Sequence, residues 1–125
     1  MEKIRIVYVD DDSDNLLVFE QLFNGMFDVN SCNDPFEARK VVKEFKPHAV
    51  ITDYRMPGKN GIALIHELFK SFPNLHFFLT TANLEFPEFD DPSIQVGYFE
   101  KPWNIEIIID TLLNLKIYEQ NYDRG

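Results

Sequence analysis

The sequence predicts an α/β domain built from βα units around a parallel sheet. Strand-like and helix-like stretches alternate along the whole chain, which is the pattern of such units. Three strand-like runs are followed by or end in charged residues: 4–9 by Asp10 and Asp11, 49–52 by Asp53, and 96–100 by Lys101. The 125 residues, 45% of them hydrophobic, suffice for one domain with a real core and leave no room for a second, so we expect a single domain over residues 1–125.

The first half of the chain supplies three of the expected strands. After the strand at 4–9, a helix should begin at Asp12 or Ser13, either of which can cap it, and run to Gly25. Strands are expected at 27–32 and, after Pro47, at 49–53. The inward face of the first helix would carry Leu16, Phe19 and Phe23.

A second helix is predicted after Asn33-Asp34-Pro35, because a capping side chain precedes a proline at the first helical position. Its inward stripe would consist of Phe36, Ala38, Val41, Val42 and Phe45.

The second half begins with a loop at 54–61, which is rich in turn formers, and a helix with apolar residues at helical spacing. Strands follow at 75–80 and 94–99. Between them, residues 83–93 should hold at most one or two helical turns, because Pro87 and Pro92 oppose a regular helix. A final helix is expected to reach about Tyr118, and its inner face would be Ile105, Ile108, Ile109, Leu112 and Leu115.

Composition limits the classes of partner. A formal charge of −9 without Lys or Arg clusters argues against direct binding of nucleic acid. No uninterrupted apolar run exceeds four residues, so we expect no membrane span or signal peptide and a cytoplasmic protein. The single cysteine, Cys32, is interpreted as a small apolar core residue, and the three histidines show no spacing typical of a zinc site.

The charged strand ends predict a site for a divalent cation and a phosphoryl group. Carboxyl ends of parallel strands share one edge of the sheet, so Asp10, Asp11 and Asp53 should meet Lys101 in one crevice. Clustered carboxylates repel one another, and bound Mg²⁺, which prefers oxygen ligands, would remove that conflict. One carboxylate could then attack phosphorus and form an acyl phosphate. Thr80 and Thr81 would add a hydroxyl donor at the end of the neighbouring strand.

These residues resemble the receiver domain of two-component response regulators over nearly the whole chain. The matching motifs, in order, are Val9-Asp10-Asp11, Asp53 with Met56-Pro57 and Gly61, Thr81-Ala82, and Lys101-Pro102. The resemblance implies a flavodoxin-like fold: a doubly wound, five-stranded parallel sheet of order 2-1-3-4-5, with helices on both faces. The prolines in 83–93 imply that the fourth helix of that fold is irregular or shortened here.

The resemblance also assigns roles. Asp53 would accept a phosphoryl group from a histidine kinase or a histidine phosphotransfer protein. Mg²⁺ would be ligated by Asp11, Asp53 and the main-chain carbonyl of Arg55, and partly through water by Asp10. The remaining implied roles are phosphate binding by Thr81, the Ala82 amide and Lys101, switching by Thr81 and Tyr98, and tuning of dephosphorylation by Arg55 and Asn83.

The function expected from this resemblance is a signalling switch, not an enzyme. Its chemistry would be limited to autophosphorylation from small donors and autodephosphorylation, and its output would pass to a downstream effector protein or domain. Two features depart from the family: the interval from Thr81 to Lys101 is short, and prolines fall where the fourth helix should be. Lys101-Pro102-Trp103 resembles receivers within larger regulators or hybrid kinases, and the sequence leaves open whether the chain is a stand-alone regulator or part of a longer protein.

The alternative is a haloacid-dehalogenase-like phosphatase, with Asp10 as nucleophile and Asp12 as acid/base. No cap-sized insertion is present, and Asp90-Asp91 lies in a proline-bounded loop and not at a strand end, which disfavours it. A pseudo-receiver is disfavoured because every chemical position is filled. A nucleotide-binding Rossmann domain is disfavoured because no glycine-rich loop follows the first strand.

Overall fold

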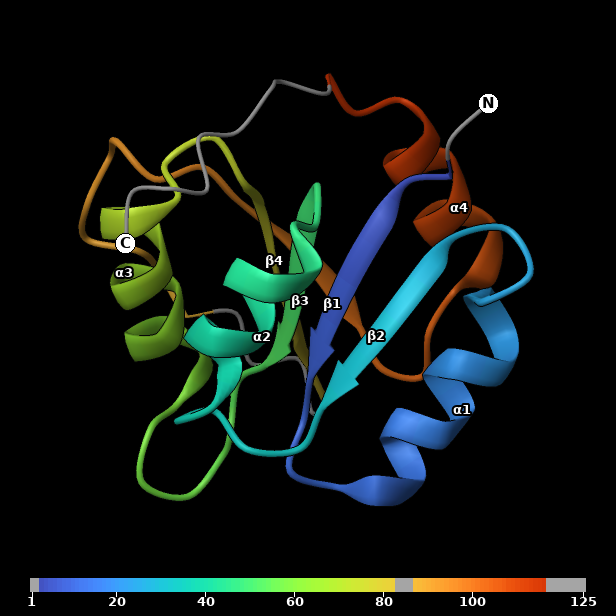
Figure 1. Cartoon of the computed structure of the whole chain (residues 1–125), viewed down its shortest axis with the longest axis horizontal. Helices are drawn as coiled ribbons and strands as arrows, with labels where there is room; N and C mark the ends of the chain where they lie inside the picture. Colours follow the sequence, from blue (N-terminus) through green and yellow to red (C-terminus); the bar gives the residue numbers. More distant parts are fainter. Residues whose placement is uncertain (1–2, 83–86, 117–125) are drawn as a thin grey trace.

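The structure, a computed structural model, describes residues 3–82 and 87–116. Figure 1 colours its helices and strands along the sequence, from blue at the N-terminus to red at the C-terminus. They are β1 (Arg5–Val9), α1 (Ser13–Phe23), β2 (Asp28–Cys32), α2 (Ala38–Phe45), β3 (Ala49–Asp53), α3 (Gly61–Ser71), β4 (His76–Thr81), β5 (Val96–Glu100) and α4 (Ile105–Leu113).

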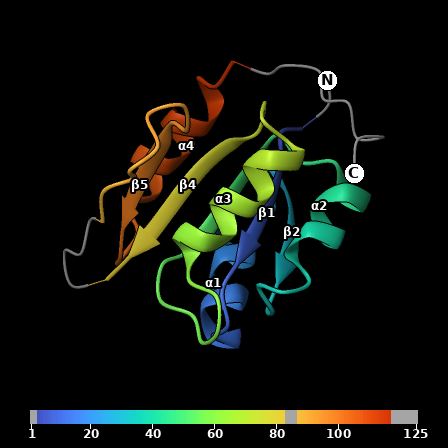
Figure 2. The same cartoon turned by 90° about the vertical axis from the view of Figure 1, so that its left-hand side faces the viewer.

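The strands form one parallel five-stranded sheet of order β2-β1-β3-β4-β5, as the sequence predicted. Figure 2 shows β5 at one edge of the sheet and β2 at the other. The helices α1 and α4 cover one face and α2 and α3 the opposite face (Figure 1). The fold is therefore doubly wound and of the flavodoxin-like type.

The sheet separates two hydrophobic cores. Successive side chains of a strand point to opposite faces, so Val7 and Val9 belong to the core under α2 and α3, while Ile6 and Tyr8 belong to the core under α1 and α4. Each of these four side chains is fully buried. Burial of both faces explains why β1 reads as a continuous apolar run without alternation.

Side-chain caps begin three of the helices close to the strand ends. Asp12 accepts hydrogen bonds from the amides of Asp14 and Asn15 and thereby starts α1. Asn60 and Asn104 cap α3 and α4 in the same way. Each cap supplies an acceptor for amides that have no partner within the helix. The predicted inward face of α1, with Leu16, Phe19 and Phe23, is buried.

The prediction for the start of α2 was wrong. Asp34 accepts a hydrogen bond from the Phe36 amide (2.9 Å), which makes a turn, and the helix begins only at Ala38. Phe36 therefore precedes the helix and is 60% exposed, with Lys59 Nζ 4.6 Å from its ring centroid. Ala38 and Val42 are buried as predicted.

The prediction for the last helix also needs correction. The helix α4 ends at Leu113, where the Asn114 amide and side chain bond the Asp110 carbonyl, and it does not continue toward Tyr118, which lies outside the described residues. Ile108 and Leu112 are buried, but Ile105 is 41% exposed. Ile105 occupies the first position of the helix, directly after the cap, and faces away from the core.

The segment between β4 and β5 lacks a helix over its described part, residues 87–95, which agrees with the predicted irregularity. Residues 83–86, including Asn83 and Phe86, lie outside the description. Phe89 packs against the core under α3, and its ring lies 5.1 Å from that of His66. Turn bonds from Ser93 to Asp91 follow.

Within the same described ranges, no helix is long and apolar enough to cross a membrane. Cys32 is buried, as expected for a core residue.

Candidate functional site

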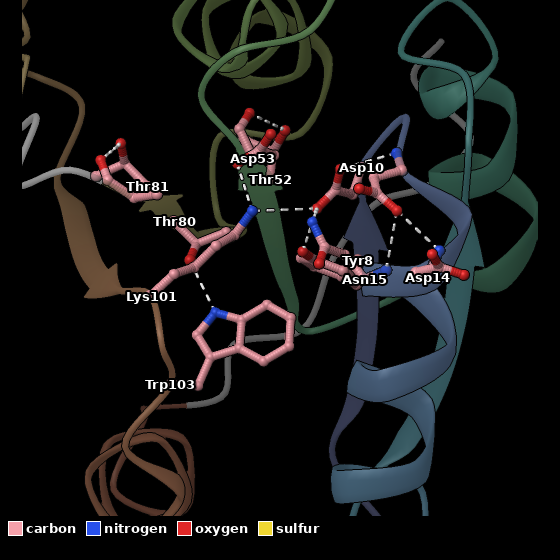
Figure 3. Close-up of polar contacts among 12 residues, drawn as sticks. Tyr8, Asp10, Asp14, Asn15, Thr52, Asp53, Thr80, Thr81, Lys101 and Trp103 are labelled. Carbon is pink, nitrogen blue, oxygen red and sulfur yellow. Dashed lines mark hydrogen bonds and ion pairs between the residues drawn. The ribbon is translucent and has the colours of Figure 1, made fainter.

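The site lies at the carboxyl ends of β1, β3 and β5. Asp10 directly follows β1, Asp53 is the last residue of β3, and Lys101 directly follows β5. Backbone hydrogen bonds extend the strand pairing to this point: the Asp10 amide donates to the Cys32 carbonyl (3.1 Å) and the Lys101 amide to the Thr81 carbonyl (2.9 Å). The parallel register thus brings together three side chains that are far apart in sequence (Figure 3).

Lys101 bridges two carboxylates. Its ammonium group donates to Asp53 Oδ1 at 2.9 Å and to Asp10 Oδ2 at 3.4 Å (Figure 3). The side chains of all three residues are largely shielded from water. Salt screens a partly buried ion pair less than a pair on the surface. The attraction of Lys101 for both carboxylates therefore persists at high salt.

Asp10 is a fully buried charge that the protein satisfies with several donors. Its Oδ2 accepts hydrogen bonds from the Tyr8 hydroxyl (2.5 Å) and from Asn15 Nδ2 (3.1 Å), besides Lys101. Its Oδ1 accepts from the Asp12 amide (3.0 Å). Its side chain is consequently fixed from β1, from α1 and from the loop after β5.

Burial has the largest effect on the pKa of Asp53, the second acid that Lys101 contacts. Burial raises the pKa of Asp53 above its ordinary value, and the nearby Asp10 charge raises it further, while the hydrogen bond from Lys101 opposes both effects. Burial and the Asp10 charge also raise the pKa of Tyr8, so the Tyr8 hydroxyl stays protonated and remains a donor. One lysine therefore only partly offsets the negative charge of the site.

The acidic residues fit a hard divalent cation. Asp10, Asp11 and Asp53 each offer one carboxylate oxygen, and these three oxygens lie within 4.8 Å of one another. All three donors are oxygens, which is the donor set that Mg²⁺ prefers, and Asp11 is exposed, which leaves the site open to water and phosphate oxygens. Burial is the main cause of the raised pKa of Asp53, and the negative charge of Asp10 adds to it; a bound cation would counter the effect of Asp10.

Not every residue predicted for the site is directed toward the acids. The Thr81 hydroxyl donates to the Ala82 carbonyl (3.0 Å), at the end of β4. Thr80 was expected to point into the same crevice, but it instead accepts a hydrogen bond from Trp103 Nε1 (2.9 Å) on the core side (Figure 3). Tyr98 is 37% exposed, and its hydroxyl donates to the Pro87 carbonyl (2.7 Å).

Of the two residues expected to tune dephosphorylation, only Arg55 lies within the described residues. The guanidinium carbon of Arg55 lies 5.5 Å from the centroid of the Tyr54 ring, in the loop after β3. Asn83 lies outside the described residues.

Sequence reasoning missed two partners of Asp10. Tyr8 lies two residues before Asp10, so the period of the strand places both on one face, and this spacing was an available signal. Asn15 lies in the first turn of α1, and nothing in the sequence singled it out from the neighbouring polar residues. Both became evident only from the hydrogen bonds to Asp10.

Asp12, the acid/base of the phosphatase alternative, serves as the cap of α1. Its Oδ1 accepts from the Asp14 amide at 2.8 Å and from the Asn15 amide at 3.3 Å. This engagement disfavours a role for Asp12 in proton transfer.

Comparison with known proteins is consistent with this geometry. The family model of the response regulator receiver domain matches residues 6–112. A protein-glutamate methylesterase/protein-glutamine glutaminase from Caulobacter vibrioides is 34% identical over 76 residues, which cover 58% of this chain and 22% of that protein. This chain spans less than a third of the length of such curated relatives.

Solved structures share the fold, and two of them serve as examples. The chemotaxis protein CheY4 of Vibrio cholerae superposes with a TM-score of 0.80 at 18% identity, over 91% of this chain and 99% of that one. The signal receiver domain of an HD domain-containing protein from Pseudomonas fluorescens gives a TM-score of 0.79 at 19% identity, over 90% and 93% of the two chains. At these identities the likeness concerns the fold alone.

Proposed function

Because this chain belongs to the family of response regulator receiver domains, which are switches of two-component signalling, we propose that Asp53 accepts a phosphoryl group from a histidine kinase or a histidine phosphotransfer protein. The observation that carries the proposal is the pairing of the Asp53 carboxylate with Lys101 Nζ at 2.9 Å, at the end of β3 and within an acidic cluster. This arrangement combines a nucleophile with a cation for the phosphoryl oxygens.

The transfer would proceed by attack of an Asp53 carboxylate oxygen on the phosphorus of a phosphohistidine. A phosphorus–oxygen bond forms, the phosphorus–nitrogen bond breaks, and the imidazole leaves with the electron pair of that bond. Lys101 already contacts the Asp53 carboxylate, so a small displacement would bring its ammonium group to the new phosphoryl oxygens. Thr81 and the Ala82 amide would complete the contacts to these oxygens.

Receiver domains bind Mg²⁺ at an acidic pocket, and the oxygens of Asp10, Asp11 and Asp53 support the same site here. The Arg55 main-chain carbonyl would be a further ligand, and Asp10 would contribute partly through water. When bound, the cation would neutralise charge on the phosphoryl oxygens. The carboxylates themselves would keep the cation next to Asp53.

The phosphorylated state would be transmitted by Thr81 and Tyr98. Movement of Thr81 toward the phosphoryl group would let Tyr98 turn inward and exchange its bond to the Pro87 carbonyl for a buried position. We propose that this change alters contacts with a downstream effector protein or domain, in the cytoplasm and without direct contact to nucleic acid. Arg55 and Asn83 would flank the path of the water that removes the phosphoryl group.

Phosphorylation with acetyl phosphate and Mg²⁺, followed by mass mapping of the modified residue, tests the proposal. The label should map to Asp53, and Asp53→Asn should abolish it, because an amide oxygen is a far weaker nucleophile than a carboxylate. Asp28→Asn, the same substitution at an exposed position of β2, should label like wild type. A label on Asp10 would instead support the phosphatase alternative.

A further inference from the structure

We infer that Tyr8 is a positioning residue of this site, whose buried hydroxyl holds the Asp10 carboxylate and thereby allows Lys101 to leave Asp10 when Asp53 is phosphorylated. The inference rests on the proposed function, since it concerns the step in which Lys101 turns to the phosphoryl group. Tyr8 would not touch the reacting atoms.

The Tyr8 side chain is held rigidly beneath the acids. It is fully buried, and its ring stacks on Phe19, with a centroid distance of 4.3 Å and an interplanar angle of 15°. Trp103 packs edge-on against it at 5.6 Å and is itself anchored by its bond to Thr80. A ring confined on two sides in a close-packed core keeps its hydroxyl in one place. That place is 2.5 Å from Asp10 Oδ2.

Three side chains compete for the same oxygen. Oδ2 of Asp10 accepts from Tyr8 (2.5 Å), Asn15 (3.1 Å) and Lys101 (3.4 Å), and Lys101 makes the longest of these contacts. Each hydrogen-bond donor that is removed destabilises a buried carboxylate. While Tyr8 and Asn15 remain, departure of Lys101 leaves Oδ2 with two donors, so the departure costs little.

Without the Tyr8 hydroxyl, Asp10 Oδ2 would have one donor fewer, and its contact with Lys101 would matter more. Asp10 is fully buried, so water does not readily replace the lost donor, and the carboxylate depends more strongly on Lys101. Lys101 would then be held on Asp10 and Asp53 at the expense of the phosphoryl oxygens. Loss of the hydrogen bond from Tyr8 to Asp10 would thus appear as weaker binding of the phosphoryl group.

The first experiment measures the affinity of the protein for beryllofluoride, a mimic of the phosphoryl group, by fluorine NMR at saturating Mg²⁺. Tyr8→Phe should bind it about fivefold more weakly than wild type, which is the effect of one buried hydrogen bond. Phe27→Leu removes a fully buried ring of the same core but leaves Tyr8, Phe19 and Trp103 in place, and it should retain wild-type affinity. Equal affinity of Tyr8→Phe and wild type, or an equal loss in Phe27→Leu, would overturn the inference.

A second experiment uses metal-free protein and no phosphoryl mimic. The ammonium group of Lys101, assigned by comparison with Lys101→Arg, should exchange its protons more slowly in Tyr8→Phe, because Asp10 binds it more firmly. Unchanged or faster exchange would contradict the proposed competition.

The wild-type protein supplies a third measurement, which decides the question even if Tyr8→Phe does not fold. The Tyr8 hydroxyl proton should be visible by NMR, and it should persist when beryllofluoride is added. Loss of this signal on binding would overturn the inference. If wild type takes no label on Asp53 and binds no beryllofluoride, the proposed function fails and the inference with it; if wild type does both and Tyr8→Phe behaves identically, only the inference fails.

Discussion

At the level of residues, burial and pairing with Lys101 have opposite effects on the pKa of Asp53. Burial and Asp10 raise its pKa, and the hydrogen bond from Lys101 lowers it, with burial the largest effect. A carboxyl group whose pKa is higher in the folded than in the unfolded state binds its proton more tightly when folded. Its contribution to stability is therefore present at low pH and is lost as the pH rises through the folded-state pKa.

This predicts that Asp53→Asn is more stable than wild type in metal-free protein at neutral pH. The difference in Tm should grow as the pH is raised from about 4, near the ordinary pKa of an aspartate, to about 7. Thermal unfolding followed by circular dichroism with a chelator present would measure it. Asp28→Asn, at an exposed position, should give no such pH dependence, and a wild type that is the more stable protein at pH 7 would contradict the prediction.

At the level of elements, residues 87–95 lie between β4 and β5 and contain no helix. At most one or two helical turns were expected in this region. The Tyr98 hydroxyl bonds the Pro87 carbonyl, Phe89 packs near His66, and Asp90 lies 3.5 Å from His66. Of residues 87–95, only Ile94, near the end of the segment, is buried in the core. The Asp90 side chain is almost fully exposed, so its pair with His66 contributes little stability. Segments with few buried contacts open at low free energy.

Hydrogen exchange should therefore be fastest in 87–95 among the described residues between β4 and α4, and it should change most when beryllofluoride binds. The physical reason is that inward rotation of Tyr98 breaks its bond to Pro87. Amides of α2, on the other half of the sheet, serve as the internal control. Protection of 87–95 that is already high and does not change would contradict the role given to this segment.

The strands and the position of the acidic site were predictable because both depend on local patterns: apolar runs ended by charge place Asp10, Asp53 and Lys101 at one edge of any parallel sheet. Phe36 and Ile105 were misjudged because each lies at a helix start. There a turn bond or a cap decides which residue begins the helix, and one residue of shift rotates a side chain by about 100°.

The role of Tyr8 was not predictable with the same ease. An aromatic residue in a buried strand usually signals packing alone, and its ring does pack against Phe19 and Trp103. Its second role depends on the distance from its hydroxyl to Asp10, which the sequence pattern does not contain.

At the level of the whole molecule, repulsion within the acidic cluster should oppose folding, and a bound cation would relieve it. The chain carries a net charge of −9, and three of its carboxylates lie within reach of one ion. In the structure, Lys101 is the cation that pairs with Asp10 and Asp53. The stability of the domain should therefore respond to the concentration of divalent cations.

We predict that Mg²⁺ raises the Tm of the unphosphorylated protein. A ligand that binds only the folded state at ten times its Kd adds about 1.4 kcal/mol, which corresponds to a rise of several degrees. Asp11→Ala should lose most of this gain, whereas Asp28→Ala should keep it. Melting curves with and without millimolar Mg²⁺ provide the measurement, and a wild-type curve indifferent to Mg²⁺ would exclude the metal site.

Trp103 is the only tryptophan of the chain, and its indole joins the end of β4, through Thr80, to Tyr8 and Phe19 on β1 and α1. Indole fluorescence responds to changes in hydrogen bonding and in the packing of neighbouring rings. Because the indole contacts β4 and β1 close to the sheet edge that carries the acidic site, its emission would report a rearrangement there from inside the protein. The chain thus contains its own optical probe, without any label attached to the surface that partners would use.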